Sequence, residues 1–366
     1  MRILILTKRQ TTHHDILDQR FGRSWHLPNE LAGLGNTVHV VCLSYQTRAT
    51  GQVLNFDTKN GGRLAFQSLN TGVLPPLGFL NYVQRIRSAI QQLHPDVIYA
   101  MSDPVYVIVG DRLTRPKAIP FFCDLQDNYE TYASVRLPGV RHLFHRALKR
   151  ADGVTCVSQL LSEKIASFNT NALTLNNGVD RDIFSHRDRM QCRLELGLPT
   201  NARLIGFAGT VDPQRGTDIL FSGLRRLKPE FPDLQLALAG AAKGKIPRQN
   251  DIHYLGQLPH QKVPVFLNAL DLAVICNKKS EFYDYTFPIK TYEILACGIP
   301  FIASHHVALR HLLKDHQDCL FQPDDLESFV RTARQQFREP NPPPIPILDW
   351  KELGGQLENF LKGNEK

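Results

Sequence analysis

The sequence lacks the long apolar runs and paired cysteines that mark membrane-spanning or disulfide-stabilised proteins. No segment reaches the run of about 18 apolar residues that a membrane helix needs, and segment 1–14 turns polar too early to resemble a signal peptide. The seven cysteines are odd in number, scattered and without a Cys-x-x-Cys pair, which argues against a disulfide framework and a structural zinc site. We therefore expect a cytoplasmic protein whose cysteines are mostly buried thiols.

Dense Lys/Arg runs with interleaved aromatic residues are also missing, so we expect no nucleic-acid partner. The net charge of +8 is nevertheless uneven. Residues 1–178 carry 19 Lys and Arg against 12 Asp and Glu, whereas residues 179–366 carry 24 against 23. The basic half is either a solvated surface or a face for an anionic acceptor or membrane, in which case the protein would bind peripherally at the inner membrane face.

Short apolar runs rich in β-branched residues alternate with helical patterns along all 366 residues. This alternation is typical of parallel sheets covered by helices on both faces, and the chain is long enough for two such domains. The expected strands are 2–6, 37–44, 63–69, 97–101, 119–125 and 153–158 in the first half, and 203–209, 234–240, 252–256, 272–276, 300–304 and 319–323 in the second. The sequence therefore predicts an α/β protein with two Rossmann-like domains.

Turn-prone residues and prolines set the expected domain boundaries. Asn176, Asn177 and Gly178 separate the two strand series, so we expect an N-terminal domain over 1–178 and a C-terminal domain over 187–338. Segment 339–366 is predicted to be an extended proline-rich linker followed by a helix that crosses back to the N-terminal domain.

The stretch Phe-Pro-Ile-Lys-Thr-Tyr-Glu at 287–293 predicts a helix that begins near Pro288 after a buried strand. Its N-terminus would expose free N–H groups, and Lys290 would add a full positive charge, so the stretch indicates an anion site. Glu293 could accept hydrogen bonds from a pair of sugar hydroxyls. The competing interpretation is a surface pair between Lys290 and Glu293, contributing about 0.3 kcal/mol.

A second stretch, 206–217, predicts a strand that ends at Gly209 and a loop that contains Arg215 and Gly216. It matches the spacing of neither the Gly-x-Gly-x-x-Gly fingerprint nor the P-loop, and alone it is weak evidence. An Arg fork matches phosphate oxygens, however, and two such loops in one domain strengthen the prediction of an anion site.

The order of these motifs from about residue 150 to 325 resembles the retaining, nucleotide-sugar-dependent glycosyltransferases of family 4. The resemblance implies the GT-B fold, with two Rossmann-like domains facing across a cleft. It implies a diphosphate contact for Arg215 and a ribose contact for Glu293. Thr210 stands where the family usually has a first Arg, and Tyr285 where many members have a Glu that touches the donor sugar. The donor-side residues are Gly209, Thr210, Arg215, Tyr285, Phe287, Ile289, Lys290 and Glu293.

On the acceptor side, the resemblance points to the loop after the first strand, where Arg20 and Gly22 stand in place of a Gly-Gly pair. We expect Arg20 and Arg23 either to face an anionic or membrane-borne acceptor or to pair with acidic residues of their own loop. Gln126 replaces a common His, and beside it Asp127 is expected either to orient the acceptor hydroxyl or to cap a helix.

The sequence thus predicts a glycosyltransferase that moves a sugar from a nucleotide-diphosphate sugar to a glycan, lipid-linked or small-molecule acceptor, with retention. Arg215, Lys290 and Asp127 are the candidate catalytic residues. No cofactor is expected beyond the co-substrate, and no metal, because the chain has no obvious Asp-x-Asp pair after a strand. The alternatives are an inactive donor-binding subunit and a nucleotide-sugar epimerase on the same fold.

Overall fold

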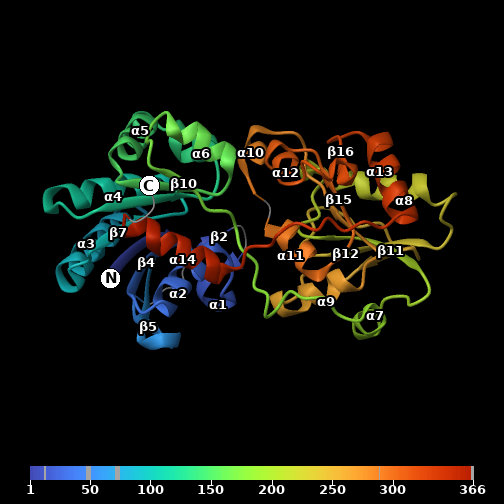
Figure 1. Cartoon of the computed structure of the whole chain (residues 1–366), viewed down its shortest axis with the longest axis horizontal. Coiled ribbons are helices and arrows are strands. Elements are labelled where there is room, and N and C mark those ends of the chain that lie inside the picture. Colours follow the sequence, from blue (N-terminus) through green and yellow to red (C-terminus); the bar gives the residue numbers. More distant parts are fainter. Residues whose placement is uncertain (12–13, 47–50, 71–74, 288, 364–366) are drawn as a thin grey trace. The chain divides into compact units, whose positions relative to one another are not determined.

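The computed structural model describes residues 1–11, 14–46, 51–70, 75–287 and 289–363, which form two compact α/β units (Figure 1). The first unit comprises Met1–Asn177 together with Trp350–Lys366, and the second comprises Gly178–Asp349. The proline-rich segment 339–349 therefore belongs to the second unit. Among the described residues, no helix has both the length and the apolar character needed to cross a lipid bilayer.

The first unit is built on an eight-stranded sheet with the order β10-β9-β8-β7-β1-β4-β6-β5. All neighbouring strands are parallel except β5, which runs antiparallel to β6. The central strands are continuous apolar runs because helices cover a parallel sheet on both faces. The strands are β1 (Arg2–Lys8), β4 (Thr37–Ser44), β5 (Val53–Phe56), β6 (Arg63–Asn70), β7 (Val97–Ala100), β8 (Phe121–Leu125), β9 (Gly153–Cys156) and β10 (Ala172–Thr174), with a separate hairpin of β2 (Gln10–Thr11) and β3 (His14–Asp15).

The helices of the first unit include the last helix of the chain, as the sequence predicted. Helix α14 packs along α2, and the two helices lie side by side in Figure 1. A Cβ on Gly354 would lie 2.5 Å from Glu30 Cβ, and the ring of Trp350 stacks on that of His26 at 4.9 Å. The helices are α1 (Ile16–Gln19), α2 (Arg23–Gly33), α3 (Pro75–Leu93), α4 (Pro104–Thr114), α5 (Val140–Arg150), α6 (Gln159–Ala166) and α14 (Trp350–Leu361).

The second unit has a six-stranded, fully parallel sheet with the order β13-β12-β11-β14-β15-β16. Its strands are β11 (Arg203–Ala208), β12 (Leu234–Ala239), β13 (Ile252–Tyr254), β14 (Leu272–Ile275), β15 (Phe301–Ser304) and β16 (Leu320–Phe321). Its helices are α7 (Arg189–Leu196), α8 (Asp218–Leu227), α9 (Val263–Asn268), α10 (Glu281–Tyr285), α11 (Ile289–Cys297), α12 (Val307–Leu312) and α13 (Leu326–Arg338).

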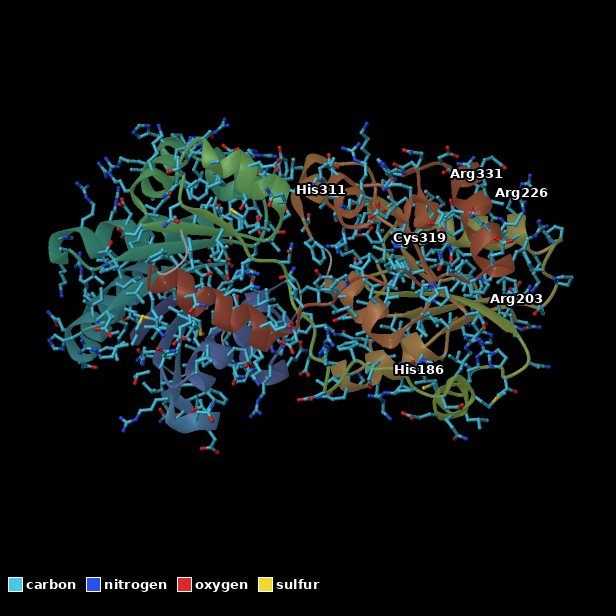
Figure 2. All side chains as sticks on the ribbon, in the orientation of Figure 1. His186, Arg203, Arg226, His311, Cys319 and Arg331 are labelled. Atoms are coloured by element: carbon cyan, nitrogen blue, oxygen red, sulfur yellow. The ribbon has the colours of Figure 1, made fainter. Side chains whose placement is uncertain are left out.

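Helices α8 and α13 pack together over the core of this second sheet. Arg226 on α8 pairs with Glu327 on α13 at 3.4 Å, and Figure 2 shows Arg226 beside Arg331 of α13. Arg203, at the start of β11, lies 4.8 Å from the ring centroid of Phe231. The start of β11 is the end of that strand away from Gly209, so the loops that follow the strands lie at the opposite, carboxyl end of the sheet.

Candidate functional site

Two glycines allow the first two strands of the second sheet to approach each other closely at their carboxyl ends. Gly209 follows β11 and its N–H donates to the Ala239 carbonyl at 2.7 Å. Gly240 follows β12 with φ +133°, and a Cβ there would lie 2.0 Å from the Gly209 oxygen. Both positions therefore require glycine, and they leave exposed backbone at an edge where parallel sheets bind ligands.

Lys290 lies against this glycine pair from the first turn of α11. Its Nζ is 5.1 Å from the ring centroid of Phe207, and a Cβ on Gly209 would lie only 2.2 Å from Nζ. Burial lowers the pKa of Lys290, and the charge of Arg215 lowers it further, while Glu293 and Cys276 raise it. The competing interpretation, a surface pair between Lys290 and Glu293, is therefore wrong, because Glu293 is buried and Lys290 lies half-buried against Gly209.

Glu293 is 6% exposed and lines a small cavity with Lys290, Gly206 and Ala208. Burial raises the pKa of its carboxyl to about 7, although the nearby Lys290 charge acts in the opposite direction. A carboxyl group in this state can either accept or donate a hydrogen bond near neutral pH.

Arg215 lies in a tight turn in the loop that follows Gly209. The Asp212 carboxylate accepts the Gln214 N–H at 2.9 Å to start the turn, and Gly216 ends it with φ +89°. The Arg215 side chain is half-buried, and in the described part of the chain it forms no ion pair. It is therefore available to an anion from outside the protein.

Two buried hydroxyls mark the helix starts on either side of these cations. Thr217 precedes α8 and is 1% exposed, and Thr291 lies in the first turn of α11 and is 0% exposed. Neither Oγ1 has a hydrogen-bond partner among the residues that the structure describes. Sequence reasoning missed both threonines, because a Thr near a helix start is usually read as a cap.

The remaining donor-side residues lie around the start of α11, which begins at Ile289 within the range predicted. Tyr285 ends α10, and Thr210 follows Gly209, with both half-exposed. Phe287 is buried, with its ring 4.8 Å from that of Tyr292, so it anchors the segment before α11. Pro288 lies outside the described residues.

In the first unit, Asp127 lies just beyond the end of β8. Its carboxylate accepts the Tyr132 hydroxyl at 2.7 Å, and burial raises its pKa to about 6. The N-cap position of the short helix that follows is Asn128, which makes no capping hydrogen bond with its side chain, so the alternative that Asp127 caps this helix is wrong. Lys8, at the end of β1, lies 5.7 Å from the centroid of the Tyr132 ring. This edge thus combines a carboxyl, a phenol and an ammonium.

Gln126 occupies the place where the family resemblance led us to expect a histidine. Its amide nitrogen donates to Ser102 at 2.9 Å and to Ser24 at 3.2 Å. Ser102 has φ +81°, and its hydroxyl lies 2.5 Å from that of Thr7. Gln126 is therefore one member of a hydroxyl network at the carboxyl ends of β1 and β7.

The expectation for the arginines after β1 was wrong for Arg23. Its guanidinium forms a buried pair with Asp124, with two contacts of 2.7 Å, and donates to the carbonyls of Leu175 and Asn176. Arg20 is exposed and stacks over Trp25 at 5.5 Å.

The expected pairing within that loop is also wrong, because Asp15 and Asp18 pair with Arg9 instead. Gly22 begins α2 with φ +78° and open space around its Cα. Neither arginine therefore pairs with these two aspartates, and only Arg20 of the two is accessible.

The described residues contain no group of three or more His, Cys, Asp or Glu side chains arranged to hold a metal. All seven cysteines are free and buried, as predicted.

Comparisons with known proteins agree with this geometry. Residues 24–183 match the model of "Glycosyltransferase Family 4", and residues 202–338 match "Glycosyl transferases group 1". TuaC of Bacillus subtilis (strain 168), assigned to teichuronic acid biosynthesis as a glycosyltransferase, is 25% identical over 70% of this chain and 68% of its own. TuaH of the same organism, assigned likewise, is 25% identical over 44% of this chain, and the match spans less than half of TuaH, 42%.

Among solved structures, Anabaena HepE in complex with UDP superposes with a TM-score of 0.70 at 16% identity, covering 100% of this chain and 98% of HepE. This likeness shows the fold. The two family models together match most of the chain and divide it near the boundary between the two units. The chain is therefore a glycosyltransferase of the GT-B fold, with a family 4 domain followed by a group 1 domain.

Proposed function

We propose that this protein transfers a sugar from a nucleoside diphosphate sugar to an acceptor hydroxyl, with retention and without a divalent metal. The observation that carries the proposal is the grouping of Arg215, Lys290 and the starts of α8 and α11 at one edge of the second sheet. Helix N-termini and unpaired cations together favour a phosphorylated ligand.

The donor would place its ribose on Glu293 and its diphosphate on Arg215 and Lys290. Gly209 and Gly240 leave backbone exposed next to Lys290, which gives phosphate oxygens room to approach. HepE has been solved with UDP and with UDP-glucose, which supports a uridine donor for this chain as well.

The leaving diphosphate gains negative charge as the bond from sugar to phosphate breaks. Arg215 and Lys290 would stabilise that charge in the transition state, which is where electrostatic catalysis has its largest effect. The leaving diphosphate could then accept the proton of the incoming hydroxyl, so that the new bond forms on the same face and the configuration is retained.

The acceptor would bind to the first unit, with its hydroxyl oriented by Asp127. The carboxyl of Asp127 and the hydroxyl network around Gln126 suit the hydroxyl groups of a glycan. The buried Arg23 removes one of the two cations that suggested an anionic acceptor. The assignment of TuaC to teichuronic acid biosynthesis supports a glycan acceptor.

The test is a coupled measurement of nucleotide release and product formation. UDP-sugars are incubated with the purified protein, with and without a panel of glycan acceptors, and the anomeric configuration of the product is read by NMR. Acceptor-dependent UDP release with a retained configuration is expected. An inverted product would contradict the mechanism. Epimerised donor, with no transfer to any acceptor, would contradict the function.

A further inference from the structure

A second basic side chain lies next to Arg215, outside the set of residues predicted for the donor. Lys278 follows strand β14, and its backbone N–H donates to the Arg215 carbonyl at 3.1 Å. A Cβ on Gly216 would lie 3.2 Å from both the nitrogen and Cγ of Lys278. The two loops therefore touch, and the stem of Lys278 packs on Gly216.

The backbone that carries Lys278 is fixed on both sides. The Asn277 N–H donates to Ser304 Oγ at 3.0 Å, and its carbonyl lies 3.3 Å from His306 Nε2. Ser280 then caps α10. Because β11 and β14 are neighbours in the sheet, these contacts hold Lys278 at the strand end adjacent to Gly209.

The backbone of Lys278 thus adjoins that of Arg215, and Lys290 lies against Gly209, at two neighbouring strand ends. Within the described residues, no carboxylate oxygen lies within 4.0 Å of the charged nitrogens of Arg215, Lys278 or Lys290. Asp212, in the same loop as Arg215, is already paired with Lys243 at 3.5 Å. Like charges grouped in this way repel one another, and a bound anion removes that repulsion.

We propose that Lys278 binds the donor diphosphate and supplies the positive charge that Thr210 does not. This inference rests on the proposed function and assigns a residue to its diphosphate site. The unpartnered, buried hydroxyl of Thr217 is an independent sign of a ligand here, because it follows Gly216 at the start of the ten-residue helix α8. Arg215 and Lys278 approach the phosphates from two loops, and the start of α8 lies beside them.

The adjacent Lys279 provides a matched control, because it has the same charge, lies one residue away and is more exposed. Lys278→Met keeps the stem that packs on Gly216 and removes the charge, Lys278→Arg keeps the charge, and Lys279→Met removes the neighbouring one. Binding of inorganic pyrophosphate, UMP and UDP to each variant is measured by calorimetry, and thermal unfolding verifies that each variant is folded.

Lys278→Met should weaken pyrophosphate and UDP binding about tenfold or more, as for a lost charge-assisted contact. Binding of UMP should change much less, Lys279→Met should change pyrophosphate binding by less than about twofold, and Lys278→Arg should restore most of the affinity. Equal losses for both methionine variants would overturn the assignment, because any nearby positive charge would then have the same effect on binding.

The outcome separates this inference from the proposed function. If the unmodified protein binds pyrophosphate through Lys278 but binds no UDP, the Lys278 assignment stands and the uridine donor is wrong. If it binds UDP and Lys278→Met binds it equally well, the donor site stands and Lys278 has no part in it.

Discussion

Both sheets have positively charged residues near the carboxyl ends of their strands, but these residues are paired with acids in the first unit and not in the second. In the first unit, the buried arginine Arg23 is neutralised by Asp124, and Arg9 by Asp15. In the second, burial and the nearby charge of Arg215 lower the pKa of Lys290, while Glu293 and the Cys276 thiol raise it. A paired buried charge indicates a structural role, whereas grouped unpaired cations indicate a ligand that is still to bind.

The largest effect that would test this contrast is on the stability of the first unit. Arg23→Ala leaves the Asp124 carboxylate buried, with Thr155 among its remaining partners, and should cost about 3 to 5 kcal/mol in the free energy of unfolding. The control is Arg20→Ala, in the same loop, which loses the contacts of an exposed side chain with the rings of Trp25 and Phe56 and should cost less than about 1 kcal/mol. Urea unfolding of both variants measures the difference, and equal costs would contradict a structural role for Arg23.

The opposite result is expected for Arg215. The Arg215 charge disfavours the charged form of Lys290. Arg215→Ala removes this repulsion, so it should leave the stability of the protein unchanged or slightly higher. Binding of the nucleoside diphosphate should weaken by about 1.5 to 3 kcal/mol. Calorimetric titration with UDP tests this, with Arg225→Ala on the exposed side of α8 as the control. Unchanged affinity for UDP would remove Arg215 from the donor site.

The sequence predicted the architecture because parallel strands buried on both faces leave a strong signal. All twelve predicted strands are present, and α11 begins at Ile289 as expected. The short strand β10 and the antiparallel edge strand β5 were missed, and β5 is only four residues long and mostly exposed.

The site was predicted less completely than the fold. Gly209, Arg215, Lys290 and Glu293 lie in recognisable motifs, so their neighbourhood could be expected from strand order. Lys278 could not, because its position depends on a contact between two loops more than 60 residues apart in the sequence. The pairing of Arg23 with Asp124 joins residues 101 positions apart and leaves no local pattern either.

Glu293 offers a test of the second unit through pH. Its pKa is raised to about 7 in the folded protein, above its unfolded value of about 4.3, so the folded state binds more protons between these values. The contribution of this group to stability is therefore present at acidic pH and is lost as pH rises from about 4.3 to 7. Glu293→Gln should remove this decline. Between pH 5 and pH 8 the unmodified protein should therefore lose about 1 to 2 kcal/mol more of its unfolding free energy than the variant does.

The same variant tests the ribose contact. Glu293→Gln should weaken binding of UDP more than binding of pyrophosphate, because only UDP carries a ribose. Urea unfolding at several pH values and calorimetry with both ligands give the two measurements. Equal affinity losses for UDP and pyrophosphate would place Glu293 away from the ribose, and an unchanged pH slope would contradict its burial as a carboxyl group.

A smaller effect is expected at Asp127, seen in the pH dependence of turnover. Burial raises its pKa to about 6, while the hydrogen bond from Tyr132 lowers it. If the carboxylate orients the acceptor hydroxyl, turnover should rise as pH passes through about 6, and Tyr132→Phe should move that rise to higher pH. Asp127→Asn should abolish the rise. A profile that is the same in all three proteins would show that Asp127 does not act on the acceptor.

The smallest expected effect is that of a chelator, and it tests whether protein cations alone neutralise the leaving group. Arg215 and Lys290 already bring positive charge to the edge where the diphosphate is proposed to bind, so a divalent ion would add to a site that is cationic without it. Turnover with and without excess EDTA should therefore agree within about twofold. The Arg215→Ala variant gives a sharper test. Magnesium would partly restore the activity of this variant if the ion could take over the role of the arginine. If turnover of the unmodified protein disappeared with EDTA and returned with magnesium, the unpaired cations would not be sufficient to neutralise the leaving group. The contrast between the two sheet edges would then have to include a metal.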